Sequence, residues 1–193
     1  MAKKIVLLAV MALVAVVVAI PASASADVWT DNGIQLGEGE TANQSFEGFL
    51  QLNAGANGTL GCQVTVEIEA EGPSGGRITK FNPTTSTCEG TKVFAGCVVT
   101  SDSSNIGGGW NISSASTPLS VTAAGGLNLT LHVHFKSCFS ALTTIHIEFG
   151  AWFLSVTLSS GLISKLSVSG TSTTGVVISG SLTPESTPTL GLE

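Results

Sequence analysis

The sequence predicts an all-β protein. The expected architecture is an antiparallel β-sandwich, Greek-key or jelly-roll-like, and the alternative is a partly open β-barrel. Beyond residue 26, apolar and polar residues alternate in several segments, and no stretch sustains the 3.6-residue apolar period of a helix. Clusters of glycine, proline, serine and asparagine separate these segments. Short strands with one apolar face each are typical of antiparallel sandwiches and barrels.

Residues 1–26 have the layout of a secretory signal peptide. Lys3 and Lys4 precede an unbroken apolar run from Ile5 to Ile20, and small residues up to Ala26 offer cleavage sites. The run is shorter than the ~20 residues of a membrane-spanning helix. We therefore expect cleavage after Ala26, contact with the membrane only during export, and a mature protein that is secreted or held at the cell surface.

The low charge of the chain limits the classes of function. Only 10% of the 193 residues are charged. Once Lys3 and Lys4 are removed from the seven basic residues, five remain against thirteen acidic ones, which gives a net charge of −8. Phosphate binding needs a basic surface, so the composition argues against a nucleic-acid partner.

Alternation is clearest in four segments of the chain, which are 64–70, 129–135, 145–149 and 152–158. Weaker strand candidates are 45–52, 77–82, 92–100, 110–114, 118–124, 162–169 and 175–182. We expect a single all-β domain over 27–183, because neither half of the chain alone would bury much core. Residues 184–193 contain two prolines and are expected to form a flexible C-terminal tail.

The cysteines are expected to form two disulfides, because an exported protein meets an oxidising compartment. They are Cys62, Cys88, Cys97 and Cys138, and four cysteines allow three connectivities. If 62–71 and 77–88 flank a turn at 73–76, Cys62 falls nearly opposite Cys88. This favours Cys62–Cys88 with Cys97–Cys138, while the spacings match no zinc module.

Three histidines lie close together in the sequence, at His132, His134 and His146. If 129–136 and 144–150 form a hairpin with Val133 opposite Ile147, His134 lies opposite His146 and His132 opposite Glu148. Three imidazoles and a carboxylate form a ligand set that suits zinc or copper. The same alternation also fits an ordinary solvated sheet face, so no cofactor is assigned and metal binding is kept as an alternative.

Three other features suggest chemistry only weakly. Residues 72–76 match G-x-S-x-G, but they lie between two expected antiparallel strands, where a nucleophile elbow does not occur. Glu67, Glu69 and Glu71 share one strand face, which suits weak calcium binding or a solvated edge. Exposed tryptophans would offer a sugar-stacking surface. No catalytic residue is assigned, and we expect the protein not to be an enzyme.

Several short segments resemble a group of exported, disulfide-containing all-β proteins of actinobacteria, most of them uncharacterised. The segments are Cys97–Asp102, Trp110–Ile112, Thr117–Leu119 and Ser179–Glu185. The resemblance implies a secreted β protein, supports the disulfides and gives no active-site residue. We therefore expect a non-catalytic protein that recognises a glycan, an envelope component or another protein, with its oligomeric state open.

Overall fold

The computed structural model describes residues 27–96, 98–102, 109–113, 118–122, 127–134 and 144–193. These residues form β-strands and short 3-10 helices, so the all-β prediction is confirmed. The strands are β1 (Trp29–Asp31), β2 (Ile34–Gln35), β3 (Thr41–Asn53), β4 (Thr59–Glu71), β5 (Gly75–Pro83), β6 (Glu89–Gly90), β7 (Val98–Asp102), β8 (Trp110–Ser113), β9 (Leu119–Thr122), β10 (Leu127–His134), β11 (Thr144–Ser159), β12 (Leu162–Ser172), β13 (Val177–Pro184) and β14 (Leu190–Leu192). The 3-10 helices are η1 (Gly55–Asn57), η2 (Thr85–Thr87) and η3 (Lys92–Phe94).

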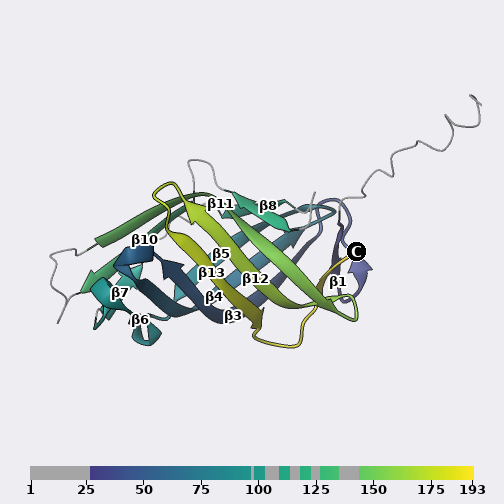
Figure 1. Cartoon of the computed structure of the whole chain (residues 1–193). Helices are drawn as coiled ribbons and strands as arrows, with labels where there is room; N and C mark the ends of the chain where they lie inside the picture. The colour runs from purple at the N-terminus through teal and green to yellow at the C-terminus, as the bar shows by residue number, and fades with distance from the viewer. Residues whose placement is uncertain (1–26, 97, 103–108, 114–117, 123–126, 135–143) are drawn as a thin grey trace, which may run out of the picture.

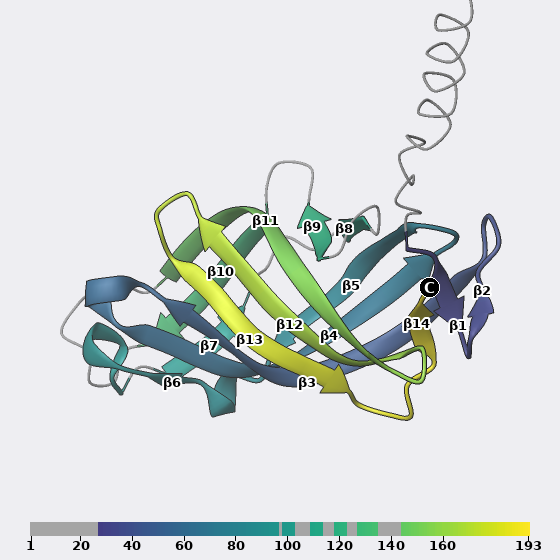
Figure 2. The ribbon, with the colours of Figure 1, turned by 45° about the vertical axis from the view of Figure 1, so that its right-hand side comes forward.

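Eight strands close into an antiparallel barrel (Figures 1 and 2). Around the barrel they follow the order β3, β4, β5, β8, β9, β11, β12 and β13, and β13 pairs with β3 to complete the circle. The structure is thus the barrel that the sequence offered as an alternative, closed rather than partly open, and not the preferred sandwich. Alternation buries one face of each strand in either architecture, so the pattern could not separate them.

The longest strand, β11, joins segments that the sequence predicted separately, 145–149 and 152–158. A register shift between Phe149 and Trp152 lets one strand run through both. Its first half pairs with β10 and its second half with β9, while β12 covers its other edge. β7 pairs with β10 and extends the sheet beyond the barrel.

Large side chains fill the interior of the barrel. Phe81, Trp110 and Trp152 form an aromatic cluster, with ring centroids 5.5 Å apart for the two Phe81 pairs and 4.9 Å apart for the two tryptophans. Both tryptophan side chains are fully buried. A barrel of eight strands has room for such side chains or for one small ligand, and here side chains occupy its centre.

One end of the barrel is closed by strands from both ends of the described chain (Figure 2). β1 pairs with β14 at this end. The side chain of Trp29, the first residue of β1, is completely buried. The expectation of a flexible tail over 184–193 is therefore wrong for Leu190–Leu192, because the apolar side chains of Leu190 and Leu192 are buried. The two prolines suggested a loop, but they lie outside the short strand.

The expected strand over 92–100 is also only partly correct. Its first part forms η3, where Lys92 adopts a left-handed backbone with φ 54°. β7 begins at Val98. In the part of the chain that the structure describes, no helix is long and apolar enough to span a membrane.

Candidate functional site

A polar groove lies on the outer face of the barrel, over β13, β3 and β4. Its volume is about 360 Å³. It is lined by Glu47, Gly48, Gln63, Val64, Thr65, Thr84, Thr87 and Thr183. Strand alternation points the polar side chains outward, and the register sets Glu47 beside both Thr65 and Thr183. The groove is therefore built by one residue row across three neighbouring strands and by the loop that holds η2.

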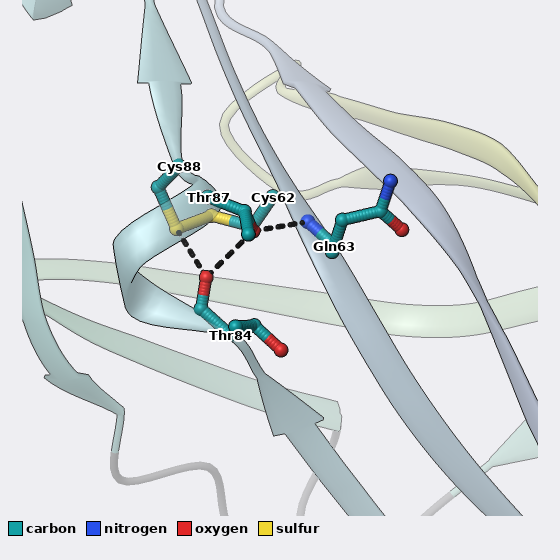
Figure 3. The surroundings of a disulfide bond; sticks show 5 residues. All are labelled: Cys62, Gln63, Thr84, Thr87 and Cys88. Carbon is teal, nitrogen blue, oxygen red and sulfur yellow. Dashed lines mark hydrogen bonds between the residues drawn. A yellow bond between two sulfur atoms is a disulfide. The ribbon is translucent and has the colours of Figure 1, made fainter.

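Hydrogen bonds fix the η2 loop against β4. The N–H of Thr84 donates to the carbonyl of Gln63 at 2.7 Å. The N–H of Gln63 donates to Oγ1 of Thr87 at 3.0 Å (Figure 3). Oγ1 of Thr87 in turn donates to the carbonyl of Thr84 at 2.7 Å. The wall of the groove is thus a fixed part of the barrel.

The predicted disulfide between Cys62 and Cys88 is present and staples the same loop (Figure 3). The Cα atoms of the two cysteines lie 4.1 Å apart, and Gly61 pairs with Glu89 immediately beside them. The turn at 73–76 does join antiparallel strands, as the sequence predicted. The second predicted pair, Cys97–Cys138, lies outside the described residues.

Two side chains in the groove are available to a ligand. Among the described residues, neither the Glu47 carboxylate nor the Gln63 side-chain amide has a hydrogen-bond partner, and both residues are exposed. Figure 3 shows the Gln63 amide extending away from the disulfide. The hydroxyl of Thr65 donates to Glu185 at 3.5 Å and that of Thr183 to the Glu47 carbonyl at 3.5 Å. Bonds of that length are weak, so both hydroxyls can turn toward a ligand.

An aromatic side chain borders the groove. Phe49 lies directly opposite Gln63 in the register of β3 and β4, and it is 40% exposed. All three tryptophans are buried, so none offers an exposed surface for sugar stacking. They are Trp29, Trp110 and Trp152. Phe49 is thus the aromatic face next to the polar lining.

Farther along β4, the acidic row is paired with cations from β5. Glu67 accepts from Nζ of Lys80 at 2.5 Å, and Glu69 accepts from the Arg77 guanidinium, with Nε at 2.8 Å. The hydrogen bond from Lys80, together with one from Thr79, lowers the pKa of Glu67 even though burial raises it. These carboxylates stabilise strand pairing, which counts against a calcium site on this face.

The register of β10 and β11 differs from the one expected for the histidine site. His132 pairs with Thr144, and Thr130 pairs with His146, so the hairpin is displaced by four residues along β11. His134 pairs with Val98 of β7 instead of with His146. The assumed hairpin register was wrong. The sequence shows neither that β10 also pairs with β7 nor how long the loop between β10 and β11 is. The strand positions of the three histidines and of Glu148 are described but their side chains are not, so metal binding there stays a prediction.

The described residues contain no group of three histidine, cysteine or acidic side chains that could hold a metal ion. The G-x-S-x-G match, residues 72–76, forms the turn between β4 and β5. It is therefore a strand-to-strand connection and lacks the strand-to-helix geometry of a nucleophile elbow.

The groove could not be predicted from the sequence. Alternation places Thr65 on the polar face of its strand, but no local pattern brings Glu47, Thr84 and Thr183 beside that residue. Neither a protein family, nor a curated protein, nor a solved structure matches this chain. The geometry of the groove is therefore the basis for a functional proposal.

Proposed function

We propose that this protein is an exported, non-catalytic binding protein that recognises a neutral glycan through the polar groove over β13, β3 and β4. The observation that carries this proposal is the groove lining, which combines a free carboxylate, a free amide and several threonine hydroxyls. Saccharide hydroxyls both donate and accept hydrogen bonds, and these groups supply both partners.

The neighbouring aromatic ring and the charge support the same class of ligand. Phe49 presents an apolar face beside Gln63, and sugar rings have apolar faces that pack on such surfaces. The Glu47 carboxylate and the acidic composition disfavour an anionic glycan, because like charges repel. The lining contains a single carboxylate and so lacks the pair of acidic residues that most glycoside hydrolases use.

Location outside the cytoplasm is part of the proposal. The Cys62–Cys88 disulfide supports it, because such bonds persist in oxidising compartments. The layout of residues 1–26 adds the expectation of a signal peptide.

Titration calorimetry of the oxidised protein with neutral hexasaccharides tests the proposal. The probes are maltohexaose, cellohexaose and chitohexaose. We expect one of them to bind, and we expect Gln63→Ala to weaken that binding at least ten-fold, because it removes only the free amide and keeps the backbone bonds to the η2 loop.

Gln51→Ala is the matched control. Gln51 lies on the same outer face of β3, pairs with Gly61 and does not line the groove. It should bind like the wild type. Equal affinity of the Gln63→Ala and wild-type proteins, or no heat with any of the three sugars, would contradict the proposal.

A further inference from the structure

A second hollow lies at the end of the barrel opposite Trp29. It has a volume of about 120 Å³ and is lined by Leu52, Ala54, Leu60, Phe94, Ile147, Thr174 and Val176. Every lining residue except Thr174 is apolar. A smaller hollow of about 20 Å³ continues it into the barrel and shares Leu52 and Leu60 with it. In the part of the chain that the structure describes, aromatic rings fill the centre of the barrel and a hollow remains at this end.

We propose that this cavity binds a single small apolar molecule of about the size of a benzene ring. Ligand pockets are lined mainly by apolar side chains, as this hollow is. An apolar cavity of roughly 150 Å³ in another protein remains dry and binds benzene. Ligand sites in barrels also lie preferentially at the mouth.

The wall of the cavity that contains Phe94 is held in place. Phe94 covers it from η3, and Gly90 packs against Phe94 so closely that a side chain at position 90 would collide with its backbone. Thr91 accepts from the N–H of Thr59 at 3.0 Å and donates its own N–H to the Thr59 carbonyl at 2.9 Å. The loop that carries Phe94 is therefore tied to β4.

Access to the cavity comes from its rim. Thr174 is exposed and Ala54 is half-buried, whereas Leu52, Leu60 and Ile147 are buried. The exposed part of the lining therefore lies at the β12–β13 turn and at Ala54. The lining contains no charged side chain, and the Thr174 hydroxyl is hydrogen-bonded to the Ser172 hydroxyl at 3.0 Å. This favours an uncharged hydrocarbon over a polar ligand.

The site is independent of the glycan groove. The groove faces solvent on the outside of β3 and β4, and the cavity lies at the inner mouth, so the two share no lining residue. Failure of either proposal leaves the other standing.

Fluorine NMR with fluorobenzene tests the inference on the oxidised full chain. We expect saturable binding to the wild type and at least a ten-fold loss of affinity in Ala54→Leu, which fills the cavity from its rim. Ala95→Leu is the matched control, because Ala95 is exposed on the same side of the barrel and does not line the cavity. It should bind like the wild type.

Val176→Phe fills the cavity from the residue that precedes β13, next to the Val177–Asn53 pair of β13 and β3, and keeps the test valid if Ala54→Leu fails to fold. Absence of saturable binding to the wild type, or equal binding by a folded filling variant and Ala95→Leu, would overturn the proposal. Dodecanoate is the second probe. Binding of dodecanoate without binding of fluorobenzene would also overturn it, because the occupant would then be a chain and not a ring-sized molecule.

Discussion

The ring of Phe49 covers Gly61 on the outer face of the barrel, diagonally across the β3–β4 pair. A Cβ atom at position 61 would collide with the far edge of that ring. Covering a strand glycine with an aromatic ring of the neighbouring strand compensates for the missing side chain. This contact explains why Phe49 remains only partly exposed, and it holds the ring over Gly61, next to Gln63 along β4.

A double-mutant cycle tests this contact. In a Phe49→Ala background, Gly61→Ala should raise the free energy of unfolding by about 0.5–1 kcal/mol, because alanine is less flexible than glycine in a strand. In the wild-type background the displaced ring should cancel this gain. Urea unfolding of the four proteins measures both effects. The same gain in both backgrounds would show that the two residues are not coupled.

Gly48 is predicted to tolerate no side chain. A Cβ atom there would collide with the backbone carbonyl of Ser181, where β3 and β13 close the barrel. A backbone atom cannot move aside as a ring does, so Gly48→Ala should lower the free energy of unfolding by about 1–3 kcal/mol.

Gly150→Ala provides the comparison for Gly48→Ala, because nothing lies within 4 Å of a Cβ at position 150. It should change the free energy of unfolding by less than about 0.5 kcal/mol. Thermal or urea unfolding measures both variants, and equal effects would refute the predicted close approach of β3 and β13.

The Glu67–Lys80 pair should make stability depend on pH in the acid range. The pKa of Glu67 is lowered in the folded state, mainly by the hydrogen bond from Lys80. The unfolded chain therefore binds this proton more readily. The contribution of Glu67 is fully present above its ordinary pKa of about 4.5 and is lost as the pH falls through the lower pKa of the folded state.

Lys80→Met should raise the pKa of Glu67 and reduce the loss of stability between about pH 5 and pH 3. Carboxyl NMR gives the pKa, and urea unfolding at several pH values gives the stability. Lys165→Met is the control, since Lys165 is exposed and forms no ion pair among the described residues. An unchanged Glu67 pKa in Lys80→Met would contradict the prediction.

The Cys62–Cys88 disulfide should contribute substantially to stability. It closes a sequence separation of 26 residues, for which the chain-entropy relation gives about 3.5 kcal/mol. The double variant Cys62→Ala, Cys88→Ala should lose a free energy of that order in urea unfolding. A loss below about 1 kcal/mol would mean that the hydrogen bonds of the η2 loop alone restrain this part of the chain.

The local parts of the fold could be predicted from sequence, and the closure of the sheet could not. Alternation located the strand that contains Val64 and Val66, and the turn at 73–76 correctly paired it with the next strand, which in turn favoured Cys62–Cys88. The pairing of β13 with β3 joins segments more than 120 residues apart, and no local pattern encodes it.

The groove was hidden for the same reason. Glu47, Thr65 and Thr183 become neighbours only through the long-range pairing of β13, β3 and β4. The histidine register failed because it assumed an isolated hairpin, whereas β10 also pairs with β7. The role of β14 was missed because the burial of Leu190 depends on its pairing with β1, at the other end of the chain.

Thr30→Val is predicted to stabilise the protein. Thr30 is completely buried between β2 and β14, and its Oγ1 has no hydrogen-bond partner among the described residues. A buried hydroxyl without a partner costs free energy, and valine has nearly the same shape. We expect the free energy of unfolding, measured in urea, to rise by about 1 kcal/mol.

Thr189→Val is the matched control at the same end of the barrel, because the Thr189 hydroxyl donates to Oε1 of Gln44 at 3.4 Å. Thr189→Val should give no gain, because its hydroxyl already has a partner. A loss of stability in Thr30→Val, or an equal gain in both variants, would contradict the prediction.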